Sequence, residues 1–263
     1  MFQSRIEPTP PEAGAALRVK PGDLSRLIRD ALADQRVTME FQPVVMADSP
    51  SHVILRAGFL RLLDGEGRVV RTGPLRGVVA ESTLGRDLDA ATLRLGLQAL
   101  RRHVGLRLAV HASARSLGNA AWRGALEEGL ADLGPRLVLV IEEGSSTLLA
   151  GRIARTMAEL RPHGVSFVLD DFGNGPLSLR QLQEIRFAGV KIDHPLVRSV
   201  DTLPERQALV GALISVAHRF GMFAVAKGVE TEAEAAQLRA LGADGFQGPL
   251  FGRPGPLTQC DAG

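Results

Sequence analysis

The chain has 263 residues, of which 45% are hydrophobic, with a formal net charge of +2 and a single cysteine, Cys260. This composition is typical of a folded protein with a sizeable core, and it excludes wholesale disorder. The small charge gives no support for a nucleic-acid partner. One cysteine allows no disulfide within the chain, which fits a reducing compartment. No signal peptide and no apolar run of about 18 residues is present, so we expect a cytoplasmic protein without a membrane segment.

The first 22 residues are rich in proline and predict a flexible arm. A helix is expected to follow, with Asp23 as its N-cap and apolar residues at helical spacing from Leu24 to Leu32. The next segment, residues 38–46, has the pattern of a strand but contains Pro43. Proline cannot donate to a strand ladder, so we expect this strand to be irregular or to lie at an edge.

Strands and helices are then expected to alternate along the rest of the chain. The predicted strands cover residues 38–46, 53–63, 106–112, 137–142, 165–170, 189–192, 223–229 and 245–250. The predicted helices cover residues 75–82, 84–103, 120–133, 146–161, 178–184, 204–220 and 232–241. Eight strands alternating with helices predict an α/β fold, a (β/α)8 TIM-like barrel, in one domain at residues 23–255 with a tail at 256–263.

The stretch from Val165 to Leu179 is the most informative part of the sequence. Its apolar run ends in two adjacent carboxylates, Asp170 and Asp171, and a glycine-rich turn follows. In parallel α/β folds, ligands bind at the carboxyl ends of the strands. The other predicted strand ends would bring polar groups to the same rim, namely Gln42, Arg61, His111, Glu142, Lys191, Asp193, Lys227, Glu230 and Gln247.

Four segments together resemble the EAL-domain family of cyclic di-GMP phosphodiesterases. They are FQPVV at 41–45, LDDFGNG at 169–175, VKID at 190–193 and the long segment from AKGVE at 226 to FGRP at 254. The resemblance covers about residues 24–254, and it implies a bacterial signalling protein with a modified (β/α)8 barrel. Family enzymes hold two divalent cations with acidic and amide side chains from several strands.

Several positions depart from the family's metal-binding pattern. The glutamate of the Glu-Ala-Leu motif is Ala57, the asparagine of the third strand is His111, and two further glutamates are Val140 and Lys227. Hard cations need several oxygen ligands, and a lysine adds positive charge where a carboxylate would stand. The sequence therefore predicts no metal, no cofactor and no enzymatic activity. Asp170, Asp171, Lys191 and Glu230, which match the family, would be remnants of the catalytic site.

The residues expected to bind a ligand each have a structural alternative. Asp170 and Lys227 would form an internal ion-pair network. The resemblance implies that Arg61 contacts a phosphate of the dinucleotide, and a barrel-mouth salt bridge is equally compatible with its position. Gln42 and Gln247 would contact the bases or simply line the rim. Glu230 would line the site or cap the following helix.

Two functions from different classes follow. In the first, the barrel is a metal-free receptor for cyclic di-GMP that passes the signal to a partner. In the second, the pocket is vestigial and the outer surface is a scaffold for a protein regulator. Retained phosphodiesterase activity is the third hypothesis. Asn174 and Pro176 depart from the family's dimerisation loop, so the sequence does not decide the oligomeric state.

Overall fold

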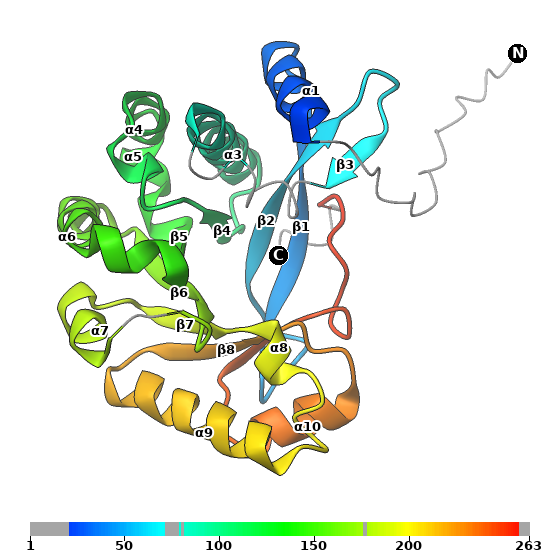
Figure 1. Cartoon of the computed structure of the whole chain (residues 1–263), viewed down its shortest axis with the longest axis vertical. Coiled ribbons are helices and arrows are strands. Elements are labelled where there is room, and N and C mark those ends of the chain that lie inside the picture. Colours follow the sequence, from blue (N-terminus) through cyan, green and yellow to red (C-terminus); the bar gives the residue numbers. More distant parts are fainter. Residues whose placement is uncertain (1–20, 72–78, 80–81, 176–177, 258–263) are drawn as a thin grey trace, which may run out of the picture.

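The computed structural model describes residues 21–71, 79, 82–175 and 178–257. Eight strands form a closed ring in the order β1-β9-β8-β7-β6-β5-β4-β2, and a short ninth strand, β3, extends it beyond β2 (Figure 1). The strands are β1 Val37–Met46, β2 Val53–Leu63, β3 Val69–Arg71, β4 Leu108–His111, β5 Leu137–Glu142, β6 Ser166–Phe172, β7 Gly189–Ile192, β8 Phe223–Lys227 and β9 Gly245–Gln247. The predicted single-domain barrel is confirmed.

Strand β1 modifies the usual barrel pattern because it runs antiparallel to both of its neighbours, β2 and β9. The other pairs around the ring are parallel. Of the two alternatives predicted for the proline-containing strand, irregularity is confirmed and the position at an edge is wrong. Pro43 pairs with Arg56 inside the closed ring, and the irregularity appears beside it as a register shift between Val44 and Val45.

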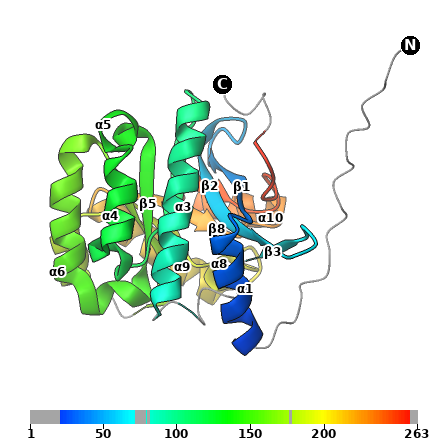
Figure 2. The same cartoon turned by 90° about the horizontal axis from the view of Figure 1, so that it is seen from above.

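The β1–β2 hairpin is longer than the rest of the barrel and carries a small satellite core. Helix α1, Pro21–Ala33, packs there against β2 and α3, Thr83–Arg102 (Figure 2). Ile28 and Leu62 are fully buried in this core. The helix begins at Pro21, so Asp23 lies inside it and the prediction of Asp23 as the N-cap is wrong. Proline is favoured in the first turn of a helix because its missing N–H has no partner there anyway.

The remaining helices follow the parallel strands, and all except α8 cover the outside of the barrel (Figures 1 and 2). They are α4 Ala120–Glu127, α5 Leu130–Leu133, α6 Glu143–Leu160, α7 Leu179–Ile185, α8 His194–Val197, α9 Pro204–Arg219 and α10 Glu232–Ala240. The predicted helix at 120–133 is two helices, interrupted at Gly129. Most of the helix predicted at 75–82 and most of the arm at 1–22 and tail at 256–263 fall outside the described residues.

Alternation along each strand divides the barrel into an outer core and an interior. Outward residues such as Leu139, Leu169 and Phe246 are buried in the main hydrophobic cluster under the helices. Inward residues such as Val140 and Val225 form separate small clusters. None of the helices in the described ranges combines the length and the hydrophobicity that a membrane-spanning segment needs.

Candidate functional site

A pocket of about 340 Å³ opens at the carboxyl ends of the parallel strands. Every strand of the ring except β5 contributes a residue to its wall, as expected where the carboxyl ends of parallel strands meet. The residues that line it are Gln42, Phe59, His111, Asp170, Lys191, His194, Lys227, Gly228, Glu230, Gln247, Gly248 and Pro249. The structure thus brings together five of the six residues predicted to bind a ligand. Arg61 is not among the lining residues.

The two carboxylates of the Asp170–Asp171 pair reach the same partner, although neighbouring residues in a regular strand face opposite sides of a sheet. The register between β6 and β7 shifts at this point, between Leu169 and Phe172. Asp171 also has a positive φ of 57°, in the left-handed region that aspartate tolerates better than most residues. This irregular backbone turns the Asp171 side chain back toward the one before it.

The partner that the two carboxylates share is the ammonium group of Lys227. Its Nζ donates a hydrogen bond of 2.8 Å to Asp170 Oδ1 and a second bond to Asp171 Oδ1, and it lies 4.0 Å from Asp193 Oδ1. On its other side, Asp170 Oδ2 lies 3.1 Å from Nε2 of His111. We call these five residues, with Lys191 beneath them, the Lys227 cluster. The predicted ion-pair partner of Asp170 is therefore in contact with it.

Burial and neighbouring charges shift the pKa values of the groups in this cluster in opposite directions. Burial alone would raise the pKa of Asp170, but the charges of Lys191, His111 and Lys227 hold that pKa well below its usual value. Burial would lower the pKa of Lys227, and Asp170 and Asp171 reverse this, so its pKa is raised. For Lys191 burial dominates, and its pKa is lowered despite the attraction of Asp170.

The two predicted amides form a chain across the opposite wall of the pocket. Gln247 Nε2 donates to Gln42 Oε1 over 2.8 Å, and Gln42 Nε2 donates to the carbonyl oxygen of Gly252 over 2.9 Å. Both side chains are buried. The remaining acceptor, Gln247 Oε1, is buried and has no hydrogen-bond partner among the described residues. A buried amide oxygen without a donor is costly, so it is suited to receive an N–H from a ligand.

Of the two remaining residues predicted to bind a ligand, Glu230 lines the pocket and Arg61 does not. The Arg61 guanidinium pairs with Glu40, Nε to Oε2 over 2.7 Å, and lies over the ring of Phe59. This is the salt bridge weighed above, and phosphate binding by Arg61 stays a prediction. Glu230 lies at the pocket rim and is half exposed. It does not cap α10, because Thr231 and Glu234 form a capping box there.

Two residues that were not predicted from the sequence, His194 and Glu143, also contribute to the site. His194 begins α8 and lines the pocket, with its Nε2 3.8 Å from Glu230 Oε1. The buried Glu143 accepts hydrogen bonds from the backbone N–H groups of Gly173 and Gly175, which fixes the turn after Asp171. The Asp-His-Pro sequence at 193–195 is a helix-start signal that could have pointed to His194. Nothing local distinguishes Glu143, whose partners lie 30 residues away.

The arrangement does not fit a divalent cation between the two aspartates. The ammonium group of Lys227 occupies the space in which such an ion would meet their oxygens. Ala57 and Val140 are buried and contribute only hydrocarbon to the barrel interior. Within the described ranges, no group of three or more His, Cys, Asp and Glu side chains is arranged to hold a metal ion.

Gly248, at the pocket rim, lies so close to the backbone of Val229 that it has no room for a side chain. A Cβ added at this residue would lie 2.1 Å from the carbonyl oxygen of Val229, which cannot move freely because it accepts from Leu250 N. We expect Gly248→Ala to lower the free energy of unfolding by about 1–3 kcal/mol, the usual cost of overpacking. Urea denaturation measures this.

The matched control is Gly124→Ala in the exposed part of α4, where an added Cβ meets nothing within 4 Å. Alanine is the better helix former, so this variant should be more stable than the wild type by about 0.5–1 kcal/mol. Equal behaviour of the two variants would contradict the assignment of Gly248 to a close backbone contact.

Comparison with known proteins places these observations in a family. The family model described as EAL domain matches residues 25–254. MucR of Pseudomonas aeruginosa, a bifunctional diguanylate cyclase/cyclic di-GMP phosphodiesterase, is 28% identical over 250 residues, covering 88% of this chain and 35% of MucR. The cyclic di-GMP phosphodiesterase NbdA of the same organism is 30% identical, covering 88% of this chain and 30% of NbdA. The chain thus spans about a third of the length of these curated relatives.

Solved structures agree with this similarity. The PaMucR phosphodiesterase in complex with cyclic di-GMP superposes with a TM-score of 0.74 at 28% identity, covering 90% of this chain and 99% of that one. These relatives are named phosphodiesterases, and this contradicts our expectation, drawn from the lost metal ligands, that the chain is not an enzyme. The match over residues 25–254 shows that the chain belongs to the EAL-domain family, whose named members include cyclic di-GMP phosphodiesterases.

Proposed function

We propose that the pocket at the carboxyl ends of the strands binds cyclic di-GMP, and that the ammonium group of Lys227 supplies the positive charge for which other members use cations. The observation that carries the proposal is the contact of Lys227 with both Asp170 and Asp171 in the wall of the pocket. The choice of ligand is supported by PaMucR, a relative whose solved structure is a complex with cyclic di-GMP.

The charges of the Lys227 cluster favour an anionic ligand more than the two aspartates alone would. Two carboxylates in a pocket wall repel a phosphate, because like charges in a partly desolvated site interact strongly. Here Lys227 and Lys191 offset Asp170 and Asp171 one for one. Asp193, 4.0 Å from the Lys227 ammonium, adds one further carboxyl group, whose pKa is raised by burial and by Asp171. The two lysines thus reduce the negative charge that a phosphodiester meets as it approaches Lys227.

The opposite wall offers groups suited to a purine base. Gln247 Oε1, which is buried and lacks a donor in the described structure, can accept an N–H from the guanine edge once its side chain turns toward the pocket. The ring of Phe59 lines the same pocket, and a base can stack on the face that Arg61 does not cover. Since neither group needs a metal, we propose that binding proceeds without a divalent cation. We also place this binding in the cytoplasm, which the single cysteine fits.

Isothermal titration calorimetry of the purified chain with cyclic di-GMP tests this function. We expect saturable binding with a micromolar or lower Kd. Gln247→Ala removes a hydrogen bond to the base and should weaken binding about tenfold. The control Gln183→Ala changes the same side chain on the exposed face of α7 and should leave the affinity unchanged. Absence of heat at high ligand concentration would refute the proposal.

A further inference from the structure

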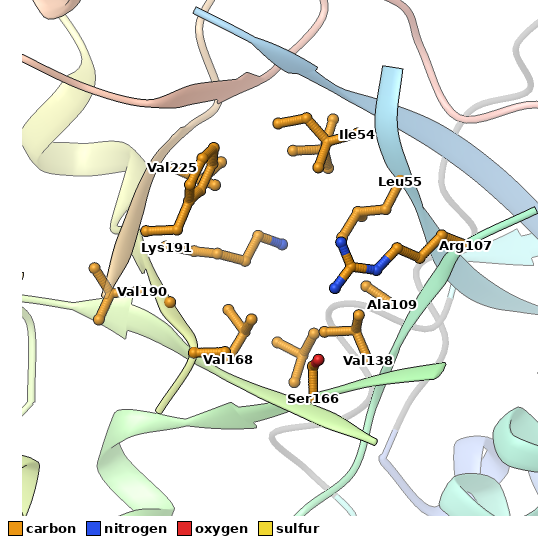
Figure 3. A pocket seen from close by; sticks show the side chains of 15 residues that line it. Ile54, Leu55, Arg107, Ala109, Val138, Ser166, Val168, Val190, Lys191 and Val225 are labelled. Atoms are coloured by element: carbon orange, nitrogen blue, oxygen red, sulfur yellow. The ribbon is translucent and has the colours of Figure 1, made fainter. Parts of the chain in front are cut away.

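The barrel contains a second cavity, of about 210 Å³, nearer to the amino ends of its parallel strands. A closed eight-stranded barrel is ordinarily filled by layers of interior side chains. Here the inward positions of three neighbouring strands hold small residues, Ala109 on β4, Val138 and Val140 on β5 and Val168 on β6 (Figure 3). These side chains are too short to meet at the barrel axis, so a space with apolar walls remains.

Two cationic side chains point into this cavity. Figure 3 shows the guanidinium of Arg107, just before β4, and the amine of Lys191, on β7, both directed toward its centre. Neither group makes a hydrogen bond or a salt bridge with any residue in the described ranges. None of the described residues that line the cavity is acidic. Asp170 and Asp171, outside the cavity, offset the charge of Lys191. The cavity therefore combines hydrocarbon walls with the positive charge of Arg107, which is an environment for an anion with an apolar body.

We propose that the barrel interior binds a small organic carboxylate with an apolar body of about six carbon atoms, the carboxylate pairing with Arg107. The volume supports this size, because an apolar cavity of about 150 Å³ accepts benzene and drug-sized ligands need about 300 Å³ or more. A short fatty acid fills the space between these limits.

Arg107 is the better of the two cations to receive the carboxylate. Its side chain is exposed at the mouth of the cavity, so the carboxylate can keep part of its hydration while the chain enters. The planar guanidinium also matches the two oxygens of a carboxylate. Lys191 is 6% exposed and already lies in the field of Asp170 and Asp171.

This site is separate from the proposed nucleotide pocket, which it meets only at Lys191. Of all the residues that line the two spaces, Lys191 is the one that they share. Binding of the carboxylate does not depend on whether the upper pocket binds cyclic di-GMP, and each can fail without the other. The shared lysine gives a spectroscopic signal for occupancy of the lower cavity.

Titration of the ¹³C-labelled chain with sodium hexanoate, followed by methyl and lysine Cε NMR signals, tests the proposal. We expect saturable binding with a Kd in the millimolar range or lower. The shifts should be largest for Val138 and Val168 and detectable for Lys191 Cε. Hexylammonium, which has the same chain and the opposite charge, should cause no saturable shift. Shifts confined to residues outside the cavity, or equal binding of the two probes, would overturn the proposal.

Variants of the cavity provide the second measurement. Arg107→Gln should weaken hexanoate binding about tenfold, and the control Arg219→Gln, an exposed arginine at the end of α9, should not change it. Ala109→Leu fills the cavity and should abolish binding. Val138→Ile adds only one methylene and serves where the larger change prevents folding, with weaker binding expected. Unchanged affinity in Arg107→Gln would refute the assignment of the carboxylate to this arginine.

Discussion

Replacement of Lys227 by methionine is expected to lower the free energy of unfolding by about 3–5 kcal/mol. Methionine keeps most of the volume of the lysine stem but removes the ammonium group that Asp170 and Asp171 share. Asp170 is 3% exposed, so its carboxylate cannot recover the lost partner from solvent. Urea denaturation at pH 7 measures the loss. The control Arg219→Met removes a charge from an exposed helix end and should change stability by less than about 0.5 kcal/mol.

A double variant separates loss of the ion pair from loss of packing. If Lys227→Met lowers the free energy of unfolding because it leaves the carboxylate of Asp170 without its partner, adding Asp170→Asn removes that carboxylate. The double variant should then lose less stability than the sum of the two single variants, with a coupling free energy of about 1–3 kcal/mol. Strict additivity would show that Lys227 and Asp170 do not stabilise one another.

Asp170→Asn alone is the second change with a large expected effect. It keeps the shape of the side chain but removes the nearest counter-charge of the buried Lys191 and one of the two partners of Lys227. Breaking a buried charge network in this way should cost about 3–5 kcal/mol at pH 7. The exposed Asp87→Asn on α3 is the matched control.

The cost of Asp170→Asn should depend on pH with a defined sign. Burial lowers the pKa of Lys191, and without Asp170, which opposes this effect, the pKa should fall further. In the pH range between this folded pKa and the ordinary lysine value of about 10.4, the unfolded chain binds more protons than the folded one. Stability then rises with pH. The variant should therefore regain stability between pH 7 and 10 more steeply than the wild type, and a parallel pH profile would contradict this account.

At low pH, the stability of the wild type should depend on the carboxylate of Asp170. The folded pKa of Asp170 is well below its ordinary value, so its contribution to stability is complete above the ordinary carboxyl pKa. That contribution is lost as the pH falls through the lowered pKa. The difference in stability between wild type and Asp170→Asn should therefore shrink in acid.

The elements that the sequence predicts best are those whose signal is local. Strands β5 and β7 begin and end at the predicted residues, because each is a short apolar run between turn-forming residues. The strand that contains Pro43 was wrongly allowed an edge position for a different reason. Proline is usually found at sheet edges because it lacks an N–H donor. A register shift next to Pro43 lets the strand lie inside the closed ring instead, and the sequence gives no sign of that shift.

The sequence predicts which residues lie at the rim of the barrel, but it does not predict which of them contact one another. Once a barrel is assumed, Gln42, Asp170, Lys191, Lys227 and Gln247 must converge on one rim, and they do. A salt bridge of Arg61 was one of two open alternatives. Its partner, Glu40, was not predicted, since both residues lie on a hairpin whose register the sequence does not determine. The joint contact of both aspartates with Lys227 depends on the irregular backbone at Asp171, for which the sequence carries no specific signal.

In the proposed function, the ammonium group of Lys227 replaces a divalent cation at the Asp170–Asp171 pair. Titration of the wild-type chain with cyclic di-GMP, once in excess EDTA and once in millimolar Mg²⁺, tests this replacement. We expect saturable binding in EDTA with a Kd within about twofold of that in Mg²⁺. Binding that is absent in EDTA and restored by Mg²⁺ would show that a metal ion, and not the lysine, provides the positive charge.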